Sequence, residues 1–296
     1  MSRPRPAVVG ASASAAIRDR VTASPTRVDV LAAFPSAVYL SHPAGIVAVV
    51  AADGIAHPNA IGLAADTSER PFAAARVGAS GRLGDHRLEI PGLHAEVRRW
   101  WRPRPALPTV AADDLARCCE DLDLLLATAA PPLPIALAAP VARLRTALHG
   151  EDIAAALAQV DGLLGLGPGL TPSGDDLLCG LLSAIALLGP AVGAPAERRV
   201  AAARVVGAAV VARAPAATTS ISAALLAHAV HGEVSDVAAD VVHALAGRQP
   251  LAPAVRALLA VGATSGRDLT AGLLAGARVV SSGVLSRSAA SSEETR

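Results

Sequence analysis

Two adjacent carboxylates, Asp175 and Asp176, stand in the segment GLGPGLTPSGDDLLCGLL, in a chain otherwise rich in Ala, Leu, Val, Arg and Pro. A carboxylate beside an anion site can orient an arginine, hold a metal that bridges to phosphate, or accept a proton from a substrate N–H group. The alternative is a structural role, in which both side chains only satisfy a helix dipole and contribute about 0.3–1 kcal/mol each. For an isolated S-x-x-D motif the structural role is the better interpretation.

The residues around these carboxylates predict a loop followed by a helix. Pro168 lies between glycines, which adopt positive φ freely, so GLGPGL cannot be helical. The helix begins either with Thr171 as N-cap before Pro172 or with Ser173 and Asp176 as a capping box, and both registers stay open. In either register, N–H groups of the first turn, hydroxyls and small residues would face a bound anion.

A second segment repeats this helix start. SGDDLLCGLL begins at Ser173 and SGRDLTAGLL begins at Ser265, and the two agree at seven of ten positions with an offset of 92 residues. Each carries a further glycine, Gly180 or Gly272, that would permit close helix packing. We predict that the two helices lie side by side in the same sense and that their N-termini form one anion pocket. Accidental similarity in a Leu- and Gly-rich chain is the alternative.

A cluster of hydroxyls lies between these two segments. Thr218, Thr219, Ser220 and Ser222 precede a helical run, where hydroxyls either cap a helix or bind an oxyanion. Taken alone, the cluster is better interpreted as capping. The sequence contains no P-loop, no G-x-S-x-G elbow and no dinucleotide fingerprint. The common nucleotide-binding and serine-hydrolase motifs are therefore excluded.

The three segments together resemble a known family. GLGPGLTPSGDDLLCGLL, TTSISAALLAHAVHG and GATSGRDLTAGLLAG, in this order, are similar to the polar motifs of a bacterial family first labelled only as a domain of unknown function. That family is associated with oxamate carbamoyltransferase as its AllH-type subunit. The similarity is specific in the first segment, good in the other two, and covers about the last two-thirds of the chain.

The resemblance implies a reaction and partners. The reaction is the phosphorolysis of oxalurate to oxamate and carbamoyl phosphate, and its reverse, in allantoin degradation, a branch of purine catabolism. Partner subunits are implied, so the chain would act as part of a multi-subunit carbamoyltransferase. The sequence lacks the Ser-Thr-Arg-Thr phosphate loop of well-known carbamoyltransferases, so its chemistry would be an independent solution.

The expected site residues are carboxylates, hydroxyls and glycines of the three segments. Catalytic roles, as orienter or proton acceptor, are expected of Asp175, Asp176 and Asp268. Substrate or anion binding is expected of Gly167, Gly169, Thr171, Ser173, Gly174, Thr218, Thr219, Ser222, Thr264, Ser265 and Gly266. Most of these match the family's polar signature positions, but the resemblance does not supply their individual roles.

Two further function classes compete with the carbamoyltransferase. The first is a non-catalytic subunit that binds a small anion or acts as the scaffold of a metabolic complex. The second is a metal-dependent enzyme that uses Asp175, Asp176 and Asp268, although no histidine joins them at a readable spacing. We expect a small anionic ligand (phosphate, carbamoyl phosphate or a carboxylate) and no cofactor, with a divalent metal left open.

The elements that must position these residues change in character along the chain. From Val28 to about Arg99, short β-prone runs alternate with Gly, Pro, Asn and Asp, which predicts a small antiparallel sheet or partial barrel. After Thr109, apolar residues recur every three to four positions, which predicts a helical bundle. The expected fold class is α+β. The expected divisions are a poorly ordered N-terminus (1–27), a β-rich domain (28–108), a helical domain (109–285) and a disordered tail (286–296).

Composition narrows the function class further. The chain is 52% hydrophobic but only 2% aromatic, and its net charge of +1 comes from scattered arginines with no lysine. Without a basic patch or stacking aromatics, nucleic-acid binding is not expected. Three cysteines without disulfide or metal spacing indicate a reducing, cytoplasmic setting. The uncharged run from Leu177 to Ala196 is interrupted by glycines, which favours a buried core helix over a membrane span.

Overall fold

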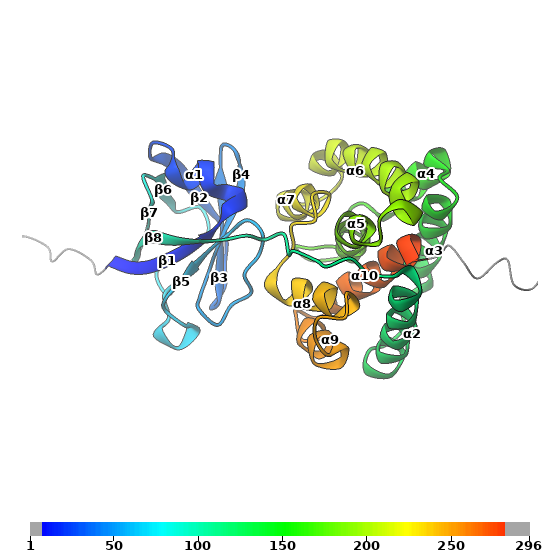
Figure 1. Ribbon diagram of the computed structural model, residues 1–296. Coiled ribbons are helices and arrows are strands. Elements are labelled where there is room, and N and C mark those ends of the chain that lie inside the picture. The colour runs from blue at the N-terminus through cyan, green and yellow to red at the C-terminus, as the bar shows by residue number, and fades with distance from the viewer. Residues whose placement is uncertain (1–7, 282–296) are drawn as a thin grey trace, which may run out of the picture. The chain divides into compact units, whose positions relative to one another are not determined.

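The computed structural model describes residues 8–281, which fall into two units (Figure 1). The first unit holds the described residues up to Arg104 together with Glu233–Asp236. The second holds Pro105–Gly232 and the chain from Val237. The units divide between Arg104 and Pro105, near the expected change of character after residue 108, and Glu233–Asp236 belongs with the first unit.

The first unit is a closed barrel. Its strands follow each other around the barrel in the order β1-β5-β4-β3-β2-β6-β7-β8. The strands are β1 (Val8–Ser14), β2 (Thr26–Ala33), β3 (Ala37–His42), β4 (Gly45–Val50), β5 (Ala60–Leu63), β6 (Ser80–Gly84), β7 (Arg87–Ile90) and β8 (Leu93–Trp101). Two pairs, β1–β8 and β4–β5, are parallel, and the other adjacent pairs are antiparallel. The predicted mainly antiparallel sheet is confirmed, and it closes fully.

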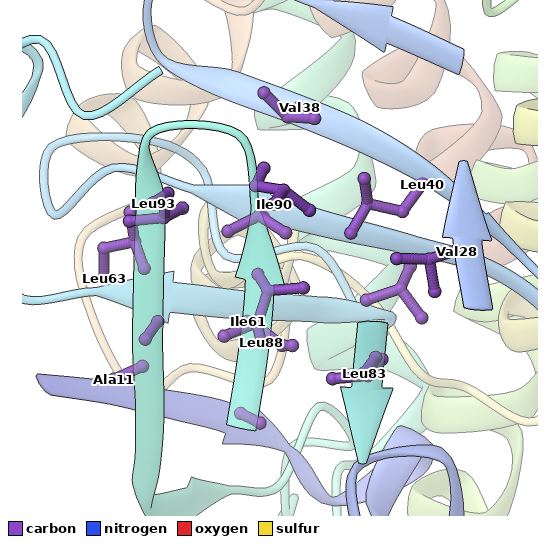
Figure 2. Close-up of a cluster of buried hydrophobic side chains, with 14 of the residues drawn as sticks. Ala11, Val28, Val38, Leu40, Ile61, Leu63, Leu83, Leu88, Ile90 and Leu93 are labelled. Carbon is purple, nitrogen blue, oxygen red and sulfur yellow. The ribbon is translucent and has the colours of Figure 1, made fainter. Parts of the chain in front are cut away.

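The barrel interior is filled by aliphatic side chains. Alternate residues of each strand point inward because successive side chains of a strand face opposite sides. Figure 2 shows Leu40, Ile61 and Leu88 from three different strands among the side chains of this core. An eight-stranded barrel is just wide enough for side chains to fill, so the first unit owes its stability to this apolar core.

The expectation of a poorly ordered N-terminus is wrong for residues 8–27. Residues 8–27 are ordered: they form β1, the short helix α1 (Arg18–Thr22) and the beginning of β2. Strand β1 closes the barrel by pairing with both β5 and β8. The strand β6 has the sequence SGRLG, in which two of five residues are glycines, so its side-chain pattern alone is a weak strand signal. Residues 1–7 and the tail 286–296 lie outside the described residues.

The second unit is helical, as predicted, and the α+β class is confirmed. Its helices are α2 (Ala112–Ala129), α3 (Ile135–His149), α4 (Ile153–Leu163), α5 (Ser173–Val192), α6 (Glu197–Ala217), α7 (Ser220–Ala229), α8 (Asp236–Leu245), α9 (Leu251–Leu259) and α10 (Ser265–Ser281). Figure 1 shows α5 in the middle of this unit with α10 beside it.

Helix α5 is buried on nearly every side because apolar or small residues surround its axis. Both α5 and α6 are long and apolar enough to cross a membrane by length and composition. Inside the structure, 83% of the tested α5 window and 39% of the α6 window are buried. The prediction that the run after Leu177 is a buried core helix is confirmed.

Candidate functional site

The first motif forms a loop that folds back on the start of α5. Gly165, Gly167 and Gly169 all have positive φ, as the sequence predicted for a non-helical segment. A Cβ on Gly167 would lie 2.9 Å from the backbone nitrogen of Ser173, so this loop approaches the first helical residue closely. A Cβ on Gly169 would meet no atom within 4 Å.

The helix begins in neither of the two predicted registers. Pro172 is the N-cap, it makes no side-chain cap bond, and its carbonyl accepts the N–H groups of Asp175 and Asp176. Neither Thr171 nor Ser173 caps the helix through its side chain. The Thr171 hydroxyl lies instead 3.0 Å from the hydroxyl of Ser265, at the start of α10.

Helices α5 and α10 lie side by side in the same sense, as the repeat predicted. A Cβ on Gly180 would lie 2.2 Å from the carbonyl oxygen of Leu269, and a Cβ on Gly272 would lie 2.2 Å from that of Leu177. Gly180 and Gly272 are 92 residues apart, and so are Leu177 and Leu269, so the two contacts are equivalent in the repeat. The two glycines therefore bring the backbones together, and the two N-termini converge.

The glycines at the two helix starts serve packing. A Cβ on Gly174 would lie 2.0 Å from the carbonyl oxygen of Leu163, and one on Gly266 would lie 1.9 Å from that of Leu258. The N–H of Gly174 donates to the Leu166 carbonyl, and the N–H of Gly266 donates to a carbonyl of the preceding turn. These two amides are occupied, so the predicted pocket has fewer backbone donors than the sequence suggested.

Asp175 connects the glycine loop to α7. It is 1% exposed, and its two oxygens accept the N–H of Gly165 at 2.9 Å and the hydroxyl of Thr218. The neighbouring Thr219 is the N-cap of α7, accepts the N–H of Ser222 and donates its hydroxyl to the loop carbonyl of residue 170 at 2.6 Å. Within this cluster, capping and loop anchoring account for both threonines.

The environment of Asp176 disfavours the charged form of its carboxyl. The residue is 7% exposed, and its Oδ2 atom has no hydrogen-bond partner. Burial raises the pKa of Asp176 to about 7, and the nearby carboxylates of Asp268 and Asp175 add to this, against the opposing hydrogen bonds from Ser265 and Thr171. The buried surroundings of this carboxyl therefore favour its neutral form over its ionised form.

Asp268 is the counterpart of Asp176 in the repeat, and it is ion-paired. It is fully buried, and its Oδ1 atom accepts hydrogen bonds from Nε and Nη2 of Arg267 at 2.8 and 2.6 Å. Its Oδ2 atom has no partner. The N–H of Asp268 donates to the carbonyl of Thr264, so the backbone of Thr264 helps to begin α10.

The predicted residues thus fall into two neighbouring groups around α5. The first joins the starts of α5 and α10 through Thr171, Asp176, Ser265 and Asp268. The second joins the glycine loop to α7 through Asp175. Two participants were missed, Gly165 and Arg267. Arg267 could have been found from the repeat, because it occupies the position of Asp175 in the second copy.

No group of three or more His, Cys, Asp or Glu side chains within residues 8–281 is arranged to hold a metal ion.

The family comparison covers the part of the chain that contains these groups. Residues 163–277 match the model of the family Oxamate carbamoyltransferase subunit AllH. This confirms the resemblance that the three motifs indicated. The AllH match begins at the last residue of α4 and extends into α10, so it includes the starts of α5, α7 and α10. No curated protein and no solved structure matches the chain.

Proposed function

We propose that this chain is a subunit of an oxamate carbamoyltransferase-like enzyme, in which the paired starts of α5 and α10 bind an anionic substrate and Asp176 transfers a proton. The AllH match supports the enzyme class. The observation that carries the site is the convergence of Thr171, Ser265 and two buried carboxyls, each with an unpartnered oxygen, at these helix starts.

When Asp176 is neutral, it does not repel an anion bound at the starts of α5 and α10. An ionised carboxylate would repel phosphate or a substrate carboxylate, whereas the protonated acid can donate a hydrogen bond to it. Because the amides of Gly174 and Gly266 are occupied, the remaining donors are the hydroxyls of Thr171 and Ser265. The positive ends of two parallel helix dipoles add to these donors.

The chemistry assigned to Asp176 follows from the proton balance of the reaction. An oxygen of hydrogen phosphate bonds to the ureido carbonyl carbon of oxalurate, and the bond from that carbon to the inner nitrogen breaks. The leaving nitrogen takes a proton from Asp176, and Asp176 takes the proton that hydrogen phosphate loses. The products are oxamate and carbamoyl phosphate with no change in total charge. An acid with a pKa of about 7 is suited to both transfers near neutral pH.

The other two aspartates, Asp175 and Asp268, have structural and electrostatic roles and transfer no proton. Asp175 holds the glycine loop against α7, because both its oxygens accept hydrogen bonds from these segments. Asp268 is neutralised by Arg267, so it leaves only part of its charge to act on Asp176. The partner subunits that the family description implies would supply further substrate contacts, in a cytoplasmic complex.

The test is phosphate-dependent formation of carbamoyl phosphate from oxalurate by the chain combined with its partner subunits. Asp176→Asn keeps the size and hydrogen-bonding capacity of the neutral acid but cannot transfer a proton, so we expect a loss in kcat of about 10²–10⁴-fold. Asp121→Asn, on the exposed side of α2, is the matched control and retains activity. Full activity of Asp176→Asn would overturn the proton transfer and favour a non-catalytic, anion-binding subunit.

Assaying the complex in the presence of a chelator tests the metal-dependent alternative. We expect activity to survive removal of divalent ions. Activity that is lost in chelator and restored by magnesium or manganese would contradict it and would place a metal beside Asp176 and Asp268.

A further inference from the structure

A groove lies on another face of the helical unit, between α2, α3 and α10. It has a volume of about 570 Å³, and its wall includes Leu126, Val141 and Leu274 together with the Pro131–Pro132 turn. Three arginines, from α3 and α10, also line it. Ligand pockets in proteins typically combine this size with mostly apolar walls and a few polar groups.

Among residues 8–281, two of the three arginines that line this groove are paired with an aspartate, and the third, Arg145, is not. Arg278 forms an ion pair with Asp123 at 2.7 Å, and Arg267 is occupied by Asp268 through two nitrogens. For Arg145, the described part of the chain provides no ion pair and no hydrogen bond. The groove therefore presents one guanidinium without an acidic partner beside apolar walls.

We infer that this groove binds a small organic monocarboxylate with an apolar body. The guanidinium of Arg145 would take the carboxylate in a bidentate pair, which is the geometry that arginine favours. The apolar walls would cover the hydrocarbon part of the ligand. One unpaired positive charge selects one negative charge, because a second ligand charge would face Asp123 or the apolar wall.

The inferred ligand differs from the substrate of the proposed function. Oxalurate and carbamoyl phosphate are polar over their whole length and would leave the apolar walls without contacts. The groove also takes most of its lining from α2, α3 and the turn between them, outside the AllH match, which starts at residue 163. It is a second binding site, and its existence does not depend on the proposed reaction.

The groove is tested with hexanoate as the probe, titrated into the full chain and followed by ligand-observed NMR and isothermal calorimetry. An eight-heavy-atom carboxylate is expected to bind with a Kd on the order of 1 mM. Hexanamide, which has the same shape without the charge, is expected to bind at least about tenfold more weakly. Absence of hexanoate binding, or equal binding of the two probes, would overturn the inference.

Three variants locate the binding. Arg145→Gln removes the unpaired guanidinium and weakens hexanoate binding by about tenfold or more. Ala271→Leu fills the groove from α10 and weakens both probes, while circular dichroism checks that the variant is folded. The matched control is Arg143→Gln, on the same helix, whose side chain bonds Gln159 on the surface and does not line the groove. Hexanoate binding that survives Arg145→Gln unchanged contradicts the assignment.

Discussion

The starts of α5 and α10 are two versions of one local structure, 92 residues apart in the sequence. Both have Ser, then Gly packed on a carbonyl of an earlier helix, then a buried Asp with one unpartnered oxygen. They differ at the third position, where Asp175 in α5 corresponds to Arg267 in α10. As a result, Asp268 has an ion-pair partner beside it in the sequence, whereas Asp176 has another carboxylate there.

Two similar helix starts can therefore hold carboxyls with different partners. Next to Arg267, Asp268 has a cation within hydrogen-bond distance, and the two side chains form an ion pair. Next to Asp175, Asp176 has only hydroxyls and further carboxylates, so burial raises its pKa. A neutral acid and an ion-paired carboxylate thus stand at neighbouring helix ends, which is the arrangement that acid–base chemistry on an anion requires.

The largest expected effect comes from separating the two copies. Gly272→Val places side-chain atoms where a Cβ alone would lie 2.2 Å from the Leu177 carbonyl oxygen, so α5 and α10 must move apart. We expect a loss of about 3–5 kcal/mol in the free energy of unfolding. Urea denaturation measures it.

Gly162→Ala, in α4, is the matched control for this variant. A Cβ there meets no atom within 4 Å, so the alanine is expected to stabilise the helix by about 0.5–1 kcal/mol. Comparable destabilisation by both substitutions would show that the contact between the two copies is not what Gly272 provides.

The second variant removes Arg267, the residue by which the start of α10 differs from the start of α5. Arg267→Leu leaves the fully buried Asp268 without its cation, and we expect a loss of about 2–4 kcal/mol, measured by thermal and urea unfolding at pH 7. Adding Asp268→Asn to Arg267→Leu removes the uncompensated charge and restores most of the stability. If the double variant is no more stable than the single one, Arg267 contributes packing and not charge.

A smaller effect, with a specific pH dependence, belongs to the first copy. The raised pKa of Asp176 means that the wild type loses stability as the pH rises from about 4 to about 7, where the unfolded chain ionises this group and the folded chain does not. Asp176→Asn lacks this loss. It should match the wild type near pH 4 and exceed it by about 1–3 kcal/mol at pH 8. Urea midpoints across this pH range provide the measurement, and a constant difference at all pH values would refute the shifted titration.

The smallest effect tests the role of Asp175 as an anchor. Thr218→Val removes a hydroxyl that donates to this carboxylate, and we expect a loss of about 1 kcal/mol, together with faster amide hydrogen exchange at Gly165. Thr128→Val is the control, because the Thr128 hydroxyl bonds only carbonyls of its own helix. Unchanged exchange at Gly165 would mean that the loop is held by other contacts.

Much of this arrangement was predictable from local sequence patterns. The helical periodicity after Thr109 gave the helices of the second unit, and the repeat of SGDDLLCGLL gave the parallel pairing of α5 with α10. Matching glycines and leucines predict pairing because close backbone approach requires small residues at the same positions of both helices.

Other features depend on contacts that a sequence does not contain. Neither Thr171 nor Ser173 caps α5, because the Thr171 hydroxyl finds Ser265 from a distant helix. Strand β1 was missed because its small residues show no strong alternation, although pairing on both sides holds it in the barrel. The raised pKa of Asp176 likewise follows from its burial, and the ion pair of Asp268 follows from the position of Arg267; both depend on the folded chain.

The most direct test of the account is a carboxyl titration by NMR on the folded chain with ¹³C-labelled aspartate, with the Asp176 signal assigned by its loss in Asp176→Asn. We expect this signal to titrate with a midpoint at about pH 7. In Arg267→Leu we expect the midpoint to move higher still, because the neighbouring Asp268 charge is then uncompensated. A midpoint near 4, the ordinary value for an aspartate, would contradict the central claim that the α5 start holds a proton-carrying acid.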